Sequence, residues 1–251
     1  MSNAWELKVD DKRSANSLFT FIIFCEDEIS EYYYFKWFET PLIKVNVIRK
    51  QKSMLTNLRK AITFSTENGI LINDGANYKL GEDGIELWCV YDRDIESNLA
   101  EIAEKDNEFN LSISLAQQND INVAWSNDAF ELWILLHLMD IDVNIDDTKK
   151  RVYYYEALTN YFKNKENPNA DLAKAKVHAT FSYKKDLKSK ANFINIVRSE
   201  ILPNTEKAIE RSMALFEIHK TKVNHFDKKP CTTVHNLVIK LLDKGKQQIP
   251  K

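Results

Sequence analysis

Hydrophobic and polar positions in the first half of the chain follow strand-like periods at four places. Nearly unbroken apolar runs at 18–25 and 87–91 predict strands buried on both faces, as in a parallel sheet. The segment 43–48 alternates apolar and polar residues, which predicts a half-buried or edge strand, and 121–125 predicts one more short strand.

Helix-like periods separate these strands. Helices are predicted at 30–40 and 55–65, and 95–118 is predicted to form one broken or two short helices. The segment 130–139 is apolar almost all round, which indicates a buried helix, and 73–84, with three glycines, is predicted to be the main loop. Alternating strands and helices predict a mostly parallel sheet with right-handed crossovers and helices on both faces.

Beyond Asp140 only helical patterns are found. They cover 152–162, 192–202, 205–219 and 233–242. The predicted fold class is therefore α/β, a mostly parallel sheet sandwiched by helices, with an all-helical C-terminal extension. We expect residues 1–140 to form the α/β domain and 141–251 to form the extension packed on the sheet.

Composition adds that the chain is a folded globular protein. Of its 251 residues 44% are hydrophobic, and glycine and proline number only five each. A net charge of -2 lacks the basicity of a nucleic-acid coat protein, so a polyanion would have to be held locally. Cys25, Cys89 and Cys231 have no CxxC spacing and are interpreted as buried thiols.

Several classes of protein are disfavoured by missing motifs. The chain has no G-x-x-x-x-G-K-[ST], no G-x-G-x-x-G and no His-x-x-x-His, which argues against ATP hydrolysis by the chain alone, dinucleotide binding and a zinc hydrolase. Residues Met1 to Arg13 lack the apolar core of a signal peptide, and no segment reaches membrane-spanning length. A cytoplasmic location is expected.

Two acidic turns follow two of the buried strands. Glu26, Asp27 and Glu28 end the first apolar run, and Asp92 and Asp94 end the run 87–91. Alternate side chains of extended backbone point the same way, so Asp92 and Asp94 could share one divalent cation. Carboxylate oxygens suit Mg²⁺ or Mn²⁺, and parallel neighbouring strands would bring both turns to one sheet edge. The alternative is that these acids are solvated helix starts.

Other charged residues could complete such a site. Glu131 lies in the apolar helix, so it must be paired, protonated or metal-bound, unless it only serves the helix dipole. Arg93 could neutralise a bound phosphate or hold the flanking aspartates apart.

A basic cluster with one aromatic residue lies further along the chain. It contains Lys174, Lys176, Tyr183, Lys184, Lys185, Lys188 and Lys190. Such a mixture is typical of a surface that follows phosphates, although a solvated helix face has the same composition. One of Lys184 and Lys185 could reach the acidic edge and neutralise charge on a transferred phosphate.

Motifs along nearly the whole chain resemble the RloB-like family. In the family's order they are Cys25 to Glu31 with Tyr34-Phe35, Tyr91 to Asp94, Ser126-Asn127 with Phe130 to Trp133 and His137, Tyr183 to Asp186, and Pro230 to Val234 with Leu237-Val238. This chain departs from the usual pattern by having Asp27 in place of a glycine, Ile29 in place of a lysine and Tyr32-Tyr33 in place of a proline-containing pair.

The resemblance implies a Toprim fold and a place in bacterial or archaeal defence loci, often beside an ATPase gene. It implies that Glu26 is a metal ligand or general acid/base and that Asp92 and Asp94 bind magnesium. By similarity to OLD-type nucleases, Glu131 and either Lys184 or Lys185 would assist.

A magnesium-dependent nuclease acting on DNA or RNA in phage defence is therefore expected. Glu26, with Glu28 or Asp27, would complete a second cation site, and Arg93, Tyr183, Lys184, Lys185 and Lys188 would contact nucleic acid. Nucleic acid, an ATPase encoded nearby and a second copy of the chain are the expected partners. The alternatives are a metal-dependent glycosyltransferase with an Asp-x-Asp motif and a non-enzymatic sensor or toxin subunit of a defence complex.

Overall fold

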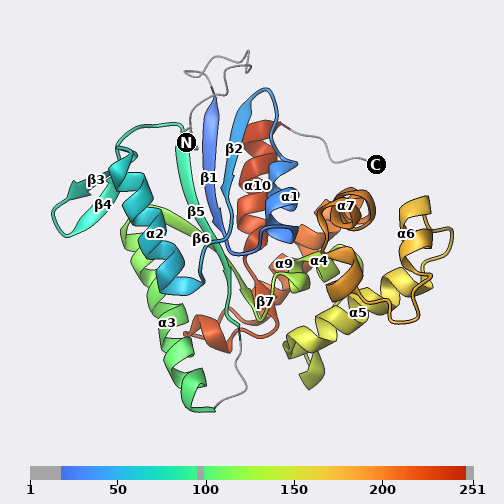
Figure 1. Ribbon diagram of the computed structural model, residues 1–251. Helices are drawn as coiled ribbons and strands as arrows, with labels where there is room; N and C mark the ends of the chain where they lie inside the picture. Colours follow the sequence, from blue (N-terminus) through green and yellow to red (C-terminus); the bar gives the residue numbers. More distant parts are fainter. Residues whose placement is uncertain (1–17, 95–98, 247–251) are drawn as a thin grey trace.

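A sheet forms the centre of the protein. The computed structural model describes residues 18–94 and 99–246, so the predictions for Met1–Arg13 and for Ile95 lie outside the described residues. In the described part a five-stranded sheet has the order β2-β1-β5-β6-β7 (Figure 1). Its strands are β1 (Phe19–Cys25), β2 (Ile43–Ile48), β5 (Ile85–Asp92), β6 (Ile121–Asn127) and β7 (Cys231–Thr232). The first four run parallel, and only β7 pairs antiparallel, with β6.

Both faces of this sheet are covered by helices. Side chains alternate along β1, so that Phe21 and Ile23 belong to one apolar cluster and Ile22 and Phe24 to the other. Helices α2 (Met54–Glu67) and α3 (Leu99–Gln118) cover one face, and α1 (Ser30–Lys36), α4 (Glu131–Leu136) and α10 (Val234–Gly245) cover the other (Figure 1). Burial on both faces explains the unbroken apolar runs, and the predicted fold class is confirmed. The arrangement is consistent with a Toprim-like fold.

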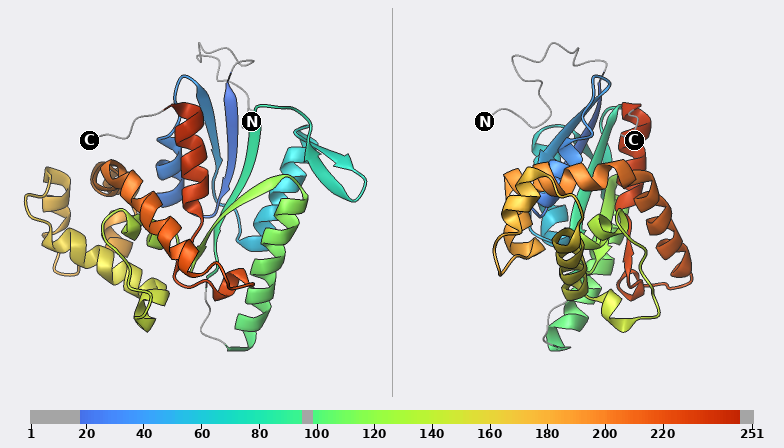
Figure 2. Two further views of the ribbon diagram at one scale, coloured as in Figure 1. Left: turned by 180° about the vertical axis from the view of Figure 1, so that it is seen from behind. Right: turned by 90° about the vertical axis from the view of Figure 1, so that its right-hand side faces the viewer.

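The C-terminal half packs beside the sheet and is mostly helical (Figure 2). Its main helices are α5 (Arg151–Asn164), α6 (Ala170–Ala175), α7 (Lys190–Asn192), α8 (Ser199–Ile201) and α9 (Thr205–Ile218). The turns η2 (Asp146–Lys149), η5 (Leu202–Asn204) and η6 (His225–Asp227) are 3-10 helices, and η3 (Tyr183–Leu187) and η4 (Phe193–Arg198) are π-helices. Helix α4 packs on α5 and α9, and η3 packs on α5, which carries the apolar cluster beyond the sheet.

Two local predictions were wrong. The expected loop 73–84 contains most of a hairpin of β3 (Leu71–Asp74) and β4 (Asn77–Leu80), with Gly75 at φ +81° in its turn. Only Leu71 of this hairpin is buried, so no alternation of apolar residues marked it. The helix predicted to break within 95–118 is continuous from Leu99 to Gln118.

The continuity of α3 has a packing reason. Phe109, Ile113 and Ala116 are all buried and recur at helical spacing, so they bridge the apparent break. Strand β7 was also not predicted, because two residues are too few to show a period. In the described part of the chain, every helix is too short or too polar to cross a lipid bilayer.

Candidate active site at the carboxyl edge of the sheet

The two acidic turns lie side by side where β1 and β5 end. These strands are parallel neighbours with Cys25 level with Val90, so the residues that follow them are adjacent. The backbone N–H of Asp92 donates to Glu26 Oε2 at 3.4 Å. Asn57 Nδ2 donates to the carbonyls of Phe24 (3.4 Å) and Val90 (3.3 Å), which ties the two strand ends together. The predicted meeting of the two acidic turns at one sheet edge is confirmed, whereas a cation shared by Glu26, Asp92 and Asp94 stays a prediction.

A cavity of about 200 Å³ opens at this edge. It is lined by the acids Glu26, Asp27, Glu31, Asp92 and Glu131, by the bases Arg151 and Lys188, and by Ala129, Phe130 and Tyr155. We call it the acidic pocket. Its acids outnumber its bases by five to two, so the pocket is suited to binding a further cation.

Burial and mutual repulsion perturb the acids. Burial, followed by the negative charge of Asp94, raises the pKa of Glu26 to about 7. Burial and neighbouring carboxylates raise the pKa of Glu31 and of Asp92 well above their usual values. Asp92 Oδ1 is buried without a hydrogen-bond partner among the described residues. A buried oxygen in this state is a ready ligand.

Lys188 is the lysine that reaches these acids. Its Nζ lies 2.8 Å from Asp27 Oδ2 and 2.8 Å from Glu131 Oε1. Burial lowers the pKa of Lys188, but the two carboxylates outweigh burial and raise it above its usual value. The sequence pointed instead to Lys184 or Lys185, which are exposed, and Lys185 Nζ donates to Thr180 Oγ1 at 3.3 Å.

Asp27 and Glu31 brace the first acidic turn. Asp27 Oδ1 accepts from the N–H groups of Ile29 (2.5 Å) and Ser30 (2.8 Å), and Glu31 Oε2 accepts from the N–H of Asp27 at 2.9 Å. Burial raises the pKa of Asp27, but Lys188 and these N–H groups outweigh burial and hold it below its usual value. Glu31 was not predicted as a site residue, although an acid in the first turn of a helix that follows a strand end could have drawn attention to it.

Arg151 was not predicted either. It begins α5, and its Nη2 pairs with Asp94 and lies 2.8 Å from Asp128 Oδ1. Asp94 has φ +49°, so the backbone has left the extended conformation, and its carboxylate is held by Arg151 instead of lining the pocket. In the sequence Arg151 follows Lys149 and Lys150 and looks like part of a solvated charged run.

Three predicted site residues lie elsewhere. The side chain of Glu28 is 46% exposed and pairs with Lys50 at 2.7 Å, and it does not line the acidic pocket. Arg93 is buried, pairs with Asp106 and donates to Asn127 Oδ1 at 3.1 Å. Tyr183 is fully buried.

The predictions that Arg93 and Tyr183 contact nucleic acid are therefore wrong. Arg93 directly follows β5, so alternation directs its side chain to the face opposite that of Asp92, towards Asp106 on α3. Tyr183 stacks on Phe162 with ring centroids 6.4 Å apart, so its ring serves the core.

The donor chemistry of the pocket fits a magnesium ion. Among the described residues no three His, Cys, Asp or Glu side chains are grouped to hold one metal ion. Mg²⁺, however, usually takes one or two protein carboxylates and completes its shell with water and substrate phosphates. Glu26 and Asp92, with the partnerless Oδ1, supply that kind of carboxylate pair.

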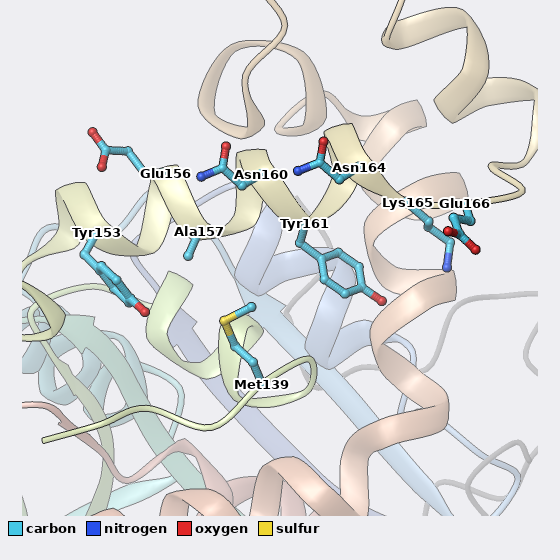
Figure 3. A pocket seen from close by; sticks show the side chains of 9 residues that line it. All are labelled: Met139, Tyr153, Glu156, Ala157, Asn160, Tyr161, Asn164, Lys165 and Glu166. Atoms are coloured by element: carbon cyan, nitrogen blue, oxygen red, sulfur yellow. The ribbon is translucent and has the colours of Figure 1, made fainter.

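A second cavity, of about 710 Å³, lies against another face of α5 (Figure 3). Tyr153, Ala157 and Tyr161 point from that helix towards Met139. The Tyr161 hydroxyl donates to Glu200 Oε1 at 2.6 Å, so its polar group is already bonded. We assign no chemistry to this cavity, because it lacks the grouped carboxylates of the acidic pocket.

Comparison with known proteins gives one match. A family model described as RloB-like protein matches residues 21–241, which includes the sheet and the C-terminal helices. No curated protein and no solved structure matches the chain.

Proposed function

The chain belongs to the RloB-like family, and on that premise we propose that it is a magnesium-dependent nuclease that hydrolyses phosphodiester bonds of DNA or RNA. The observation that carries the proposal is the meeting of Glu26 and Asp92 at the carboxyl edge of two parallel strands, with a buried Asp92 oxygen that has no partner in the described chain. The family likeness further supports a cytoplasmic role in antiviral defence by abortive infection, together with an ATPase encoded nearby.

Each group in the acidic pocket has a role in this proposal. Glu26 and Asp92 would hold Mg²⁺ or Mn²⁺, which when bound supplies Lewis acidity to the phosphate and lowers the pKa of its water. Burial and the negative charge of Asp94 raise the pKa of Glu26, and a cation bound beside it would relieve this repulsion. Lys188 holds Asp27 and Glu131 and places a positive charge on the pocket wall, where it can stabilise negative charge on the phosphate.

Asp92→Asn provides the test. It keeps the shape of the side chain and removes a charge that burial and four neighbouring acids disfavour, so the variant should be no less stable than wild type. Magnesium-dependent cleavage should fall by at least about 100-fold, because a catalytic cation supplies several kcal/mol of charge stabilisation. The control is Asp83→Asn, the same change in an exposed loop, which should cleave like wild type.

The assay uses full-length protein with magnesium on single- and double-stranded DNA, ribosomal RNA and transfer RNA, with EDTA as the blank. The neighbouring ATPase is added in a parallel series, because a partner could license cleavage. If wild type cuts none of these substrates in either series, or if Asp92→Asn cuts at the wild-type rate, the proposal is wrong.

A further inference from the structure

Cations lie over aromatic rings beside the acidic pocket. Arg49 Cζ lies 4.8 Å from the ring centroid of Tyr32, and Lys190 Nζ lies 5.5 Å from that of Tyr33. The two rings meet edge to face with centroids 4.8 Å apart. Both cations are exposed and both tyrosines are partly exposed; Tyr33 also packs against the apolar core, so one side of the group faces solvent.

Chain connectivity places this group near the acidic pocket, although its members do not line it. Tyr32 and Tyr33 directly follow Glu31, which lines the pocket, and Lys190 comes two residues after Lys188. Arg49 precedes Lys50, whose Nζ pairs with Glu28 in the first acidic turn at 2.7 Å.

A similar pair includes a residue of the pocket lining. Lys184 Nζ is 5.4 Å from the ring centroid of Tyr155, and Tyr155 lines the acidic pocket. Lys184 is exposed. One cation and aromatic pair thus includes a residue of the pocket lining, and two more lie near the pocket, whose charged side chains are mainly acidic.

We infer that these pairs bind an unpaired nucleic-acid strand and lead its backbone across the acidic pocket; the inference rests on the proposed nuclease function. Exposed lysine and arginine side chains attract phosphates, and tyrosine rings and guanidinium planes stack on unpaired bases. Bases within a duplex are already stacked on each other and are not open to such contacts. The substrate class is therefore single-stranded DNA or RNA, or the single-stranded part of a folded RNA.

Binding without cleavage tests this inference. Wild type in EDTA is titrated by fluorescence anisotropy against a labelled 20-nucleotide oligo(dT), a 20-nucleotide oligo(U) and a duplex of mixed sequence of the same length. Both single strands, or one of them, should bind more tightly than the duplex, and the two arms show whether DNA or RNA is preferred.

Variants then identify the surface. Tyr33→Ala should weaken single-strand binding by about 10-fold and Tyr32→Ala/Tyr33→Ala by more, because each stacked base contributes substantially to affinity. Tyr33→Phe keeps the ring and should bind like wild type. Tyr78→Ala, on the β3–β4 hairpin, is the matched control and should also bind like wild type.

Two results would overturn the inference: duplex binding as tight as single-strand binding, or unchanged single-strand binding by the double tyrosine variant. In the second case the cation and ring pairs stabilise only the protein surface. Binding is measured in EDTA, where no cleavage occurs. If single strands bind as expected but are not cleaved when magnesium is supplied, the proposed nuclease activity is refuted and the strand-binding surface is not. If the double tyrosine variant cleaves like wild type, and single strands and duplexes are cleaved equally well, the strand-binding surface is refuted and the nuclease activity is not.

Discussion

Lys188→Met should destabilise the protein strongly, because it removes the cation shared by two acids. The Nζ of Lys188 lies 2.8 Å from both Asp27 and Glu131, and the Glu131 side chain is only 3% exposed. Breaking a buried ion pair from one side costs about 3–5 kcal/mol. The side chains of Lys188 and Asp27 are 23% and 25% exposed, so water screens part of the interaction and we expect a loss of about 3 kcal/mol.

Urea unfolding of the metal-free protein, followed by tryptophan fluorescence, measures this loss. A thermal scan should show a drop of about 6–12 °C, given about 2–4 °C per kcal/mol for a chain of this size. The control is Lys185→Met, an exposed lysine near Lys188 in the sequence, which should stay within about 0.5 kcal/mol of wild type.

A second substitution separates lost charge pairing from lost packing. Glu131→Gln added to Lys188→Met removes the stranded negative charge, so the double variant should be more stable than Lys188→Met by at least about 1 kcal/mol. The reasoning is refuted if Lys188→Met unfolds at the same urea concentration as Lys185→Met, or if Glu131→Gln restores nothing.

Three further outcomes are expected. Arg151→Met should lower the free energy of unfolding in urea by about 2–3 kcal/mol, because the nearly buried Asp128 loses its ion pair with Arg151. Arg151→Lys should recover only part of this free energy, and full recovery would contradict a need for the two-pronged guanidinium group. Thermal stability of the metal-free protein should fall as pH rises from about 5 to 8, because the folded state keeps the proton of Glu26 up to a pKa of about 7 whereas the unfolded chain loses it near 4.5. Glu26→Gln should reduce this slope without abolishing it, because the pKa values of Glu31 and Asp92 are also raised; a rising slope would contradict the reasoning. Arg93→Met should lower the unfolding midpoint but leave magnesium-dependent cleavage per folded molecule unchanged, because Arg93 pairs with Asp106 away from the acidic pocket; a loss of cleavage would assign Arg93 a role in the reaction.

Most of the sheet could be predicted from periodicity because its central strands are buried on both faces. The apolar runs that end at Cys25 and near Asp92 have few other interpretations, and their order in the chain made parallel neighbours the simplest topology. The β3–β4 hairpin escaped prediction because it is mostly exposed, and hydrophobic pattern carries no information where nothing is buried.

The candidate site was predictable on its acidic side and not on its basic side. Glu26 and Asp92 follow strands, so topology alone brings them together. Lys188 and Arg151 each meet an acid 57 residues away through helices whose packing has no local signature. Arg93 could have been placed better, because the alternation used for Asp92 and Asp94 already directs the residue between them to the opposite side.

The division of the acidic pocket between the two halves of the chain has a consequence for its biosynthesis. All five acids that line the pocket precede both bases in the sequence, since Glu131 comes before Arg151 and Lys188. A ribosome therefore releases the repelling carboxylates first, and neutralisation by Lys188 waits until the 57 residues that follow Glu131 have been synthesised. A nascent chain that stops before Lys188 carries the acids without this compensating cation, so the pocket is complete only after both halves of the chain have been made.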